Sequence, residues 1–274
     1  MSGGQTNRPT LLVFHKLTSE LTYGVTNYSP RRFRRLLDSL SAAGRSFDSI
    51  DRSMDNTTTQ GRGHLLVSFD DGYEHLADVL PDLIDEYQLR PIIFVPTELE
   101  GRSNRWDYSH MFRPFRHLSR EQIRRLAYKG VIFGSHGASH RDLASCTKPE
   151  LARELSDSRK RLQDWSGQSV EEISYPFGRC DRRVRDAAED AGYRFGFTMD
   201  FPTAEDHPLA QGRVPVYGFD TPLSVQAKLS EGLPRRFEQA KSAVVSRLSG
   251  GTIWFNRLRA RGWTVKTIAK PPIT

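Results

Sequence analysis

The stretch HLLVSFDDGY, residues 64–73, joins a short apolar run to two adjacent aspartates and a glycine. Its first six residues, HLLVSF, form a continuous run bounded by polar residues, which is typical of a buried strand. Asp70 and Asp71 come directly after this strand, and two carboxylates so close disfavour each other's ionised form. We therefore expect a positively charged group beside this pair.

Apolar runs of this kind alternate with amphipathic segments along the chain. Further strands are predicted at residues 11–15, 91–96, 131–136, 171–178, 193–199 and 213–218. Helices are predicted between them at residues 29–44, 74–88, 119–130, 147–167 and 181–192. Strands that alternate with helices of this length favour parallel βα units, and their number indicates an α/β fold of the (β/α)-barrel kind. In such a barrel the active site lies where the strands end.

Capping residues and one proline refine the predicted helices. Ser29 followed by Pro30 marks a helix start, and Ser119 with Gln122 forms a capping-box pattern. Pro81 lies inside the 74–88 pattern, so we expect that helix to kink or restart there.

The chain divides into three predicted segments: a flexible tail at 1–9, a catalytic barrel at 10–221 and a helical extension at 222–274. One face of the extension gathers the apolar residues Phe237, Ala240, Val244 and Leu248. The basic and aromatic stretch GGTIWFNRLRARGW, residues 250–263, is expected to dock on the barrel. Contact with a membrane surface or a partner is the alternative for this stretch.

The totals restrict the class of protein. The 40 Lys and Arg residues outnumber the 33 Asp and Glu residues, for a formal charge of +7. The arginines recur on several predicted helices and build no single tract, so we interpret them as solvated helix surfaces and expect no nucleic-acid partner. Cys146 and Cys180 have no CxxC spacing, which excludes a disulfide framework and a zinc–cysteine site.

The N-terminal residues MSGGQTNRPT are polar and lack the apolar core of a signal peptide. No apolar run approaches the ~20 residues that span a bilayer. We therefore expect a cytoplasmic protein.

Polar residues follow several of the predicted strands and should meet at one edge of the barrel. They include His15, Asp70, Asp71, Ser135, His136 and His140. In SHGASH the two imidazoles are four residues apart, and with one carboxylate they suit a divalent metal that keeps positions open for water and substrate. No glutamate follows His136, so the general base must come from elsewhere, and the second aspartate of the pair is the natural candidate.

Four stretches carry a resemblance to a known family. SFDDGY (68–73), GSHGASH (134–140) and SYPFG (174–178) resemble, in order and spacing, the first three motifs of the polysaccharide deacetylases, the NodB-homology domain of carbohydrate esterase family 4. PIIFVPT (91–97) is similar to that family's strand after the first motif. The resemblance covers about residues 11–220. It implies a distorted (β/α) barrel that removes N- or O-acetyl groups from sugars, typically polymers of N-acetylglucosamine.

The resemblance also implies roles for particular residues. Asp70 resembles the family's general base. Asp71, His136 and His140 resemble the three metal ligands of the family. The implied cofactor is a divalent metal ion. Zn²⁺ is the main expectation, and Co²⁺, Ni²⁺ and Mn²⁺ are the alternatives. The backbone N–H of Phe177 would help to bind the oxyanion. Substrate contacts are expected from Tyr73, Tyr175, Pro176 and, in the long connection 97–118, Trp106.

The chain departs from the family pattern at two places. Ser174 occupies the position where the family often has an arginine that orients the base, and Arg213, which opens the RVPV strand, is the predicted substitute. The C-terminal Leu-x-His that usually supplies the catalytic acid is absent, and His207 is the sole histidine after the third motif. LLVFH (11–15) resembles the N-terminal strand of a subgroup of bacterial exopolysaccharide deacetylases, which makes His15 the predicted acid.

We therefore predict a metal-dependent deacetylase of an N-acetylated sugar, oligosaccharide or polysaccharide. Two alternatives follow from the same residues. The departures are compatible with a catalytically weakened barrel that binds glycan. The chemistry is also compatible with a metal hydrolase of another amide or ester.

Overall fold

The structure is a computed structural model, and it describes residues 9–20, 25–47, 63–103, 115–203, 206–243 and 245. The predictions for the tail before residue 9, for Trp106, for Val244 and Leu248, and for the basic stretch 250–263 lie outside the described residues.

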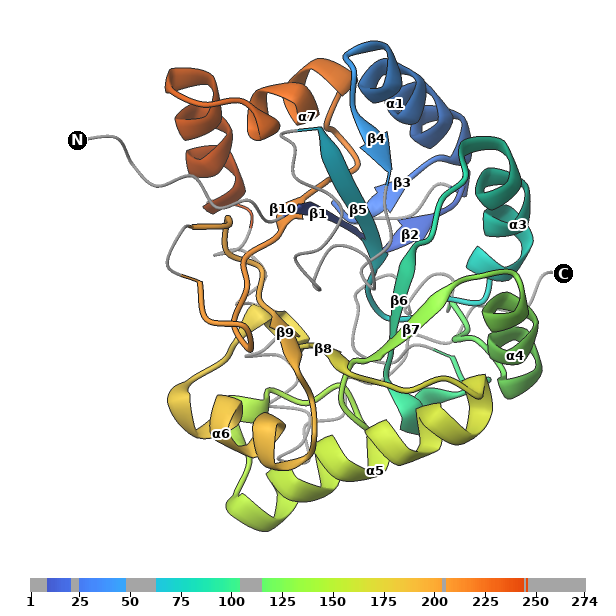
Figure 1. Ribbon diagram of the computed structural model, residues 1–274, viewed down its shortest axis with the longest axis vertical. Helices are drawn as coiled ribbons and strands as arrows, with labels where there is room; N and C mark the ends of the chain where they lie inside the picture. The colour runs from blue at the N-terminus through green and yellow to red at the C-terminus, as the bar shows by residue number, and fades with distance from the viewer. Residues whose placement is uncertain are drawn as a thin grey trace, which may run out of the picture.

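A parallel sheet of eight strands forms the centre of the molecule (Figure 1). Along the sheet the order is β10-β1-β5-β6-β7-β8-β9, and β4 pairs with β5 beside that path. The strands are β1 (Thr10–Phe14), β4 (Ser46–Phe47), β5 (His64–Phe69), β6 (Ile92–Val95), β7 (Ile132–Ser135), β8 (Glu172–Ser174), β9 (Phe195–Phe197) and β10 (Val214–Pro215). The short strands β2 (Lys16–Leu17) and β3 (Asn27–Tyr28) pair with each other.

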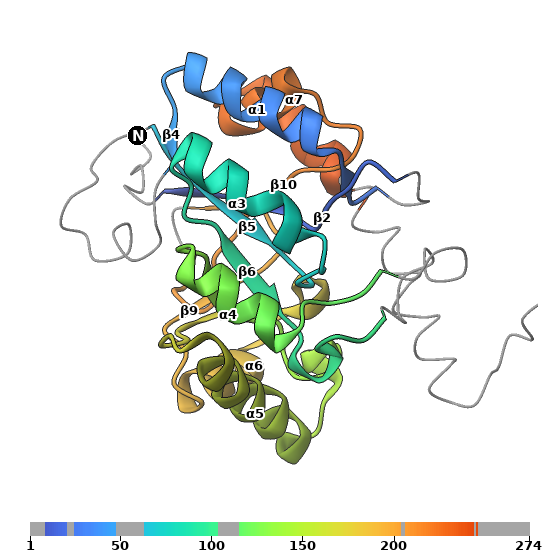
Figure 2. The ribbon, with the colours of Figure 1, turned by 90° about the vertical axis from the view of Figure 1, so that its right-hand side faces the viewer.

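Helices surround the outer face of this curled sheet (Figures 1 and 2). They are α1 (Pro30–Ala42), α3 (Leu76–Tyr87), α4 (Arg120–Tyr128), α5 (Lys148–Ser166), α6 (Arg182–Asp190) and α7 (Pro222–Leu229). The predicted cap of α1 at Ser29 and the predicted capping box of α4 at Ser119 and Gln122 are both present. The prediction of a distorted (β/α) barrel is confirmed, since single parallel strands alternate with helices that cover one face.

The strand side chains alternate between two hydrophobic clusters. The larger cluster includes Val67 and Ile93 together with the buried faces of the helices. The smaller one, which consists of strand residues alone, lines the inside of the curled sheet with Leu11, Leu66, Ile92, Phe94 and Phe197. Because side chains of a strand alternate in direction, Leu66, Ser68 and Asp70 form one inward row along β5 and its end.

Helix α3 continues through Pro81 without interruption. The prediction that the helix restarts there is therefore wrong. A proline lacks the N–H that would bond the carbonyl four residues earlier, here that of Ala77. The guanidinium of Arg125, on α4, donates to the Ala77 carbonyl at 3.0 Å. This bond replaces the lost one, and the helix continues.

The predicted strand at 171–178 is shorter than expected. β8 ends at Ser174, and Pro176–Gly178 form a 3₁₀ turn, η4, with Phe177 at φ 61°. Pro176 has no N–H for a strand ladder, and the left-handed Phe177 cannot continue an extended chain. The YPFG sequence is therefore a turn at the end of the strand.

Beyond α7, whose Val225 belongs to the larger hydrophobic cluster, the predicted extension packs by polar contacts. Residues 233–243 are helical, but Phe237 is 72% exposed and Ala240 is also exposed, so the predicted apolar face does not point inward. The buried positions are Glu238 and Ser242. Lys241, on the same side, reaches the fully buried Asp220 at 3.2 Å, and this ion pair fixes the helix to the barrel.

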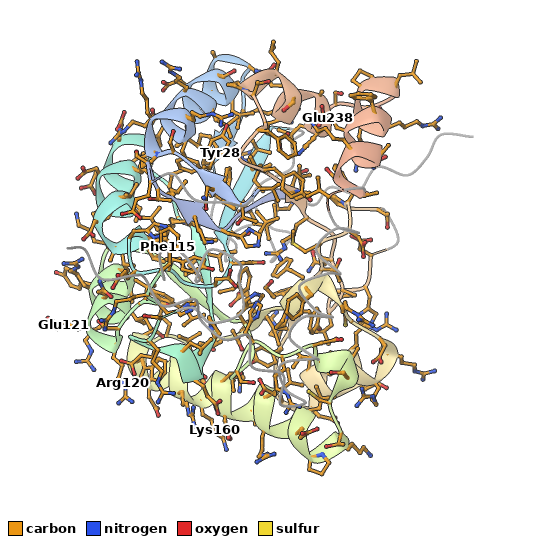
Figure 3. All side chains as sticks on the ribbon, turned by 180° about the vertical axis from the view of Figure 1, so that it is seen from behind. Tyr28, Phe115, Arg120, Glu121, Lys160 and Glu238 are labelled. Atoms are coloured by element: carbon orange, nitrogen blue, oxygen red, sulfur yellow. The ribbon has the colours of Figure 1, made fainter. Side chains whose placement is uncertain are left out.

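Charged side chains project from the outer helices, as Arg120 and Glu121 of α4 and Lys160 of α5 show (Figure 3). Across the part of the chain that the structure describes, no helix is long and apolar enough to span a membrane.

Candidate active site

Neighbouring strands bring the predicted site residues to one edge of the sheet. β5 lies between β1 and β6, and the N–H of Asp70 donates to the carbonyl of Phe14 at 2.9 Å. His15 follows Phe14, and His136 follows β7, so both leave their strands at the same edge as Asp70. This edge is where the carboxyl ends of parallel strands place an active site.

Asp70 and Arg213 form a buried bidentate ion pair. The two guanidinium nitrogens Nη1 and Nη2 donate to Oδ1 and Oδ2 of Asp70, each at 2.8 Å. The arginine is completely buried and Asp70 is 2% exposed. Arg213 directly precedes β10, in register with Leu11 of β1. Its side chain runs inside the barrel toward Asp70, and its Cζ lies 5.5 Å from the ring centroid of Phe94 and 6.0 Å from that of Phe197.

Ser174 forms hydrogen bonds with both members of this ion pair. Its hydroxyl donates to Asp70 Oδ2 at 3.1 Å and accepts from Arg213 Nη2 at 2.8 Å. A serine is short enough to leave room for a guanidinium that arrives from another strand. The structure thus places Arg213 against the carboxylate that the family arginine would orient.

The pair decides the charge of Asp70. Burial acts to raise the pKa of its carboxyl, but the Arg213 guanidinium, helped by His136, more than offsets this and lowers the pKa below its ordinary value. Asp70 therefore stays ionised at neutral pH, although it is buried.

Asp71 faces a different direction from Asp70 because its backbone is left-handed, with φ 70°. Its Oδ1 lies 3.6 Å from His136 Nε2 and 3.2 Å from His140 Nε2. The three potential ligand atoms lie within 4.8 Å of one another, and all three side chains are buried. Burial acts to raise the pKa of Asp71, and the two histidines and His15 reverse this and lower it strongly.

The chemistry of these three side chains fits a divalent metal ion. His136 Nδ1 lies 2.7 Å from the carbonyl of Ser174 and donates to it, which leaves the lone pair of Nε2 on the side of Asp71. Burial lowers the pKa of His136 to about 4, so this imidazole is neutral, as a ligand must be. One carboxylate and two imidazoles form a typical ligand set for zinc and similar ions.

The turn around Phe177 borders this cluster. The Phe177 ring packs edge-on against the His140 ring, with centroids 4.9 Å apart. Pro176 is buried beside Gly137, in the loop between the two histidines. Tyr175, a predicted substrate contact, is instead completely buried in the hydrophobic core, where its hydroxyl donates to the Leu209 carbonyl at 2.7 Å and stabilises the turn.

Tyr73, a predicted substrate contact, is instead 1% exposed and lies beside His117, a residue that the sequence pattern does not indicate. His117 is completely buried, and its Nδ1 lies 2.7 Å from the carbonyl of Asp71, to which it donates. Its ring stacks on Tyr73 with centroids 5.2 Å apart. His117 lies at the end of the long connection 97–118, and its sole signal in the sequence is a histidine at the end of an aromatic stretch.

The burial of His75 can be tested by the pH dependence of stability. Its Nε2 accepts from the N–H of Leu17 at 3.1 Å, and burial, with the positive charge of Lys16, lowers the pKa of His75 to about 4. A depressed histidine pKa means that the unfolded chain binds the proton first. The free energy of unfolding should therefore fall by up to about 3 kcal/mol from this residue as the pH drops from ~6.5 to ~4.

His75→Gln keeps an acceptor for Leu17 and cannot titrate. Chemical denaturation at several pH values should show a smaller loss of unfolding free energy in this variant than in the wild type. His207→Gln, at an exposed histidine, is the control. Equal losses in His75→Gln and the wild type would contradict the assignment of His75 as a buried neutral imidazole.

The comparison with known proteins agrees with this geometry. Residues 57–196, half of the chain, match the family of polysaccharide deacetylases. The chain belongs to the polysaccharide deacetylase family. YxkH of Bacillus subtilis (strain 168), provisionally named a polysaccharide deacetylase, is 30% identical over 137 residues. That alignment covers 50% of this chain and 44% of YxkH, so it spans less than half of the relative's length.

Solved structures of deacetylases share the fold. The deacetylase PplD of Streptococcus pyogenes, in complex with acetate, has a TM-score of 0.70 at 19% identity, and the match covers 82% of this chain and 99% of PplD. The polysaccharide deacetylase BC0361 of Bacillus cereus has a TM-score of 0.67 at 22% identity, over 81% of this chain and 69% of BC0361. The barrel of this chain is therefore that of a polysaccharide deacetylase.

Proposed function

We propose that this protein is a metal-dependent deacetylase that hydrolyses an acetyl group, an N-acetyl group in particular, from a carbohydrate. The observation that carries the proposal is the arrangement of the two adjacent aspartates. Asp71 meets His136 and His140, while Asp70 is held by Arg213 a short distance away. Ligand and base are thus separate side chains of one dipeptide.

The proposed base is Asp70. Its carboxylate is ionised, buried and fixed by two guanidinium hydrogen bonds, so it is positioned to accept a proton from a water molecule that attacks the acetyl carbon. We assign Arg213 as the residue that orients this base. A weakened, glycan-binding barrel is less well supported, because Arg213 contacts Asp70 in place of the arginine that the third motif lacks.

Asp71, His136 and His140 would hold the divalent ion, with Zn²⁺ as the first expectation. When bound, such an ion polarises a carbonyl and lowers the pKa of water. The backbone N–H of Phe177 would donate to the oxyanion, and Pro176 would border the substrate.

His15 is the proposed acid that protonates the leaving amine. Strand β5, which ends directly before Asp70, pairs with β1, and His15 directly follows β1. The same strand, LLVFH, carries the resemblance to the exopolysaccharide subgroup. We therefore propose an N-acetylated polysaccharide or oligosaccharide as the substrate class.

The metal site is tested by removing its ligands. Asp71→Ala, His136→Ala and His140→Ala should each lose the metal, because two remaining donors do not complete a site. Elemental analysis of the purified proteins measures this, together with acetate release from acetylated glycans. His207→Ala is the matched control, since it removes an exposed histidine.

Full metal occupancy in all three variants would overturn the ligand assignment. Metal in the wild type without acetate release from any acetylated glycan would instead favour the glycan-binding alternative.

A further inference from the structure

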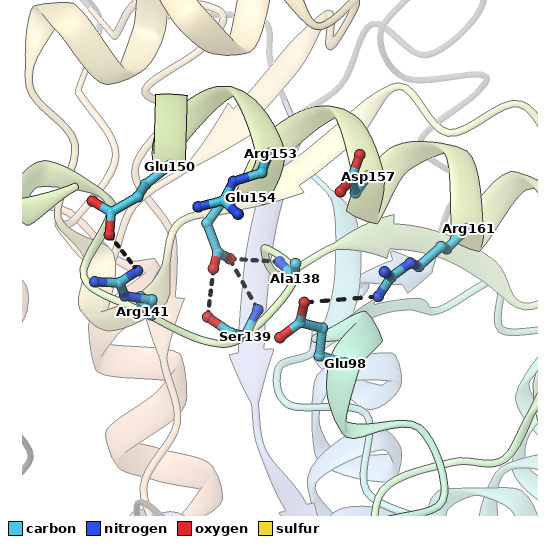
Figure 4. Close-up of a pocket in the computed structure, with 9 residues that line it drawn as sticks. All are labelled: Glu98, Ala138, Ser139, Arg141, Glu150, Arg153, Glu154, Asp157 and Arg161. Carbon is cyan, nitrogen blue, oxygen red and sulfur yellow. Dashed lines mark hydrogen bonds and ion pairs between the residues drawn. The ribbon is translucent and has the colours of Figure 1, made fainter. Parts of the chain in front are cut away.

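A buried carboxylate on α5 faces the loop that joins the two histidines (Figure 4). Glu154 is 7% exposed. Its Oε2 accepts hydrogen bonds from the backbone N–H groups of Ala138 and Ser139 at 2.8 and 2.9 Å, and its Oε1 accepts one from the Ser139 hydroxyl. These two residues lie between His136 and His140, so Glu154 holds the turn that sets the distance between the imidazoles.

The loop offers Glu154 a site suited to an anion. Two successive N–H groups that converge on one oxygen form a nest, and hydrogen bonds to an ionised acceptor are about twice as strong as neutral ones. Two of the three arginines that line the pocket beside Glu154 are engaged with other acids. Arg141 pairs with Glu150 at 3.1 Å, and Arg161 pairs with Glu98 at 3.9 Å (Figure 4).

The position of Glu154 is itself fixed against the sheet. One helical turn further along α5, the Ser158 hydroxyl bonds the hydroxyl of Ser135, the last residue of β7, at 2.8 Å. Gly137 approaches so closely that a Cβ there would lie 3.2 Å from Glu154 Oε2, and its φ of 73° already excludes most side chains. Helix α5 is thus connected to the strand through Ser158 and to the loop through Glu154.

We propose that Glu154 is a positioning residue for the metal centre. It fixes the turn between His136 and His140 before an ion binds, so that His140, whose φ is 59°, presents Nε2 toward Asp71. Without Glu154 the ion must organise this loop as it binds, and that ordering reduces its affinity. The proposal rests on the proposed function, since it concerns the same metal site.

The test is the affinity of metal-stripped protein for Co²⁺, measured by competition with a chelating dye. Glu154→Gln keeps the size of the side chain but replaces one acceptor oxygen with a donor. We expect it to bind Co²⁺ about 10- to 100-fold more weakly than the wild type, the usual effect of losing a group that orients metal ligands. Asp157→Asn is the matched control, because it removes the same charge from the same helix and pocket wall.

A purely structural role would lower the thermal stability of the metal-free Glu154→Gln protein without changing the Co²⁺ affinity of the folded form. Unchanged affinity therefore overturns the proposal. If Glu154→Gln does not fold, Ser139→Ala, which removes the hydroxyl bond alone, must weaken Co²⁺ binding measurably. A wild type that binds no Co²⁺ overturns the proposed function as well, whereas binding that is equal in the wild type and Glu154→Gln overturns this inference alone.

Discussion

Asp70→Asn is expected to keep its metal and to release acetate about 100- to 10,000-fold more slowly than the wild type, the range that a general base contributes. The amide has nearly the same shape as the carboxylate but cannot accept the proton of the attacking water. The metal should stay because Asp71, and not Asp70, meets the two histidines. Elemental analysis and single-turnover acetate release measure the two effects separately.

Asp82→Asn, at an exposed aspartate of α3, is the control for this substitution. Acetate release by Asp70→Asn at the wild-type rate, with full metal content, would remove Asp70 from the mechanism. Loss of metal in this variant would mean that the two aspartates do not have separate tasks.

Arg213→Met is expected to lower the free energy of unfolding by about 3–5 kcal/mol, because it leaves the carboxylate of Asp70 buried without its partner. The activity should fall too, and its pH dependence should change in a defined direction. Without the guanidinium, burial raises the pKa of Asp70, so the acidic limb of kcat/KM should move to higher pH. Urea denaturation and pH–rate profiles test the two expectations.

The double variant Asp70→Asn/Arg213→Met separates the ion pair from its individual members. Its loss of unfolding free energy should be smaller than the sum of the two single losses, by about 1–3 kcal/mol, because removal of both charges leaves neither unpaired. Arg124→Met, at an exposed arginine of α4, serves as the control. Strict additivity, with an unchanged acidic limb in Arg213→Met, would show that Arg213 does not hold the base.

Much of the fold follows from local patterns in the sequence. The alternation of apolar runs and capped helices predicts the βα order, because buried parallel strands and amphipathic helices have distinct periods. The meeting of one aspartate of SFDDGY with His136 and His140 was also predictable, since both motifs lie where strands end at one edge of the sheet, and the resemblance to the deacetylases implied that this aspartate is Asp71. The failures occur where tertiary contacts decide. Arg125 donates to the Ala77 carbonyl, which Pro81 leaves without its helical hydrogen bond. No local pattern at Pro81 predicts a donor from another helix.

The parts of the site that could not be predicted depend on backbone torsions and distant partners. Among the described residues, four other than glycine have positive φ, and three of them are Asp71, His140 and Phe177. Left-handed backbone costs such residues about 1–2 kcal/mol, and its presence here is typical of functional sites. Nothing in the sequence marks these positions as left-handed. Likewise, Glu154 occupies an ordinary helical position, and its role depends on the loop that α5 crosses.

The pairing of Asp70 with Arg213 also has a consequence for how the chain folds. The two residues are 143 positions apart, and β10 takes its place beside β1, so the last strand of the barrel joins the first. Contacts of such sequence separation pay a large loop-closure entropy and tend to form late. Until β10 docks, the segment that holds Asp71, His136 and His140 can exist without the arginine that keeps Asp70 charged. A nascent chain released before Arg213 would therefore carry the metal ligands but lack a competent base.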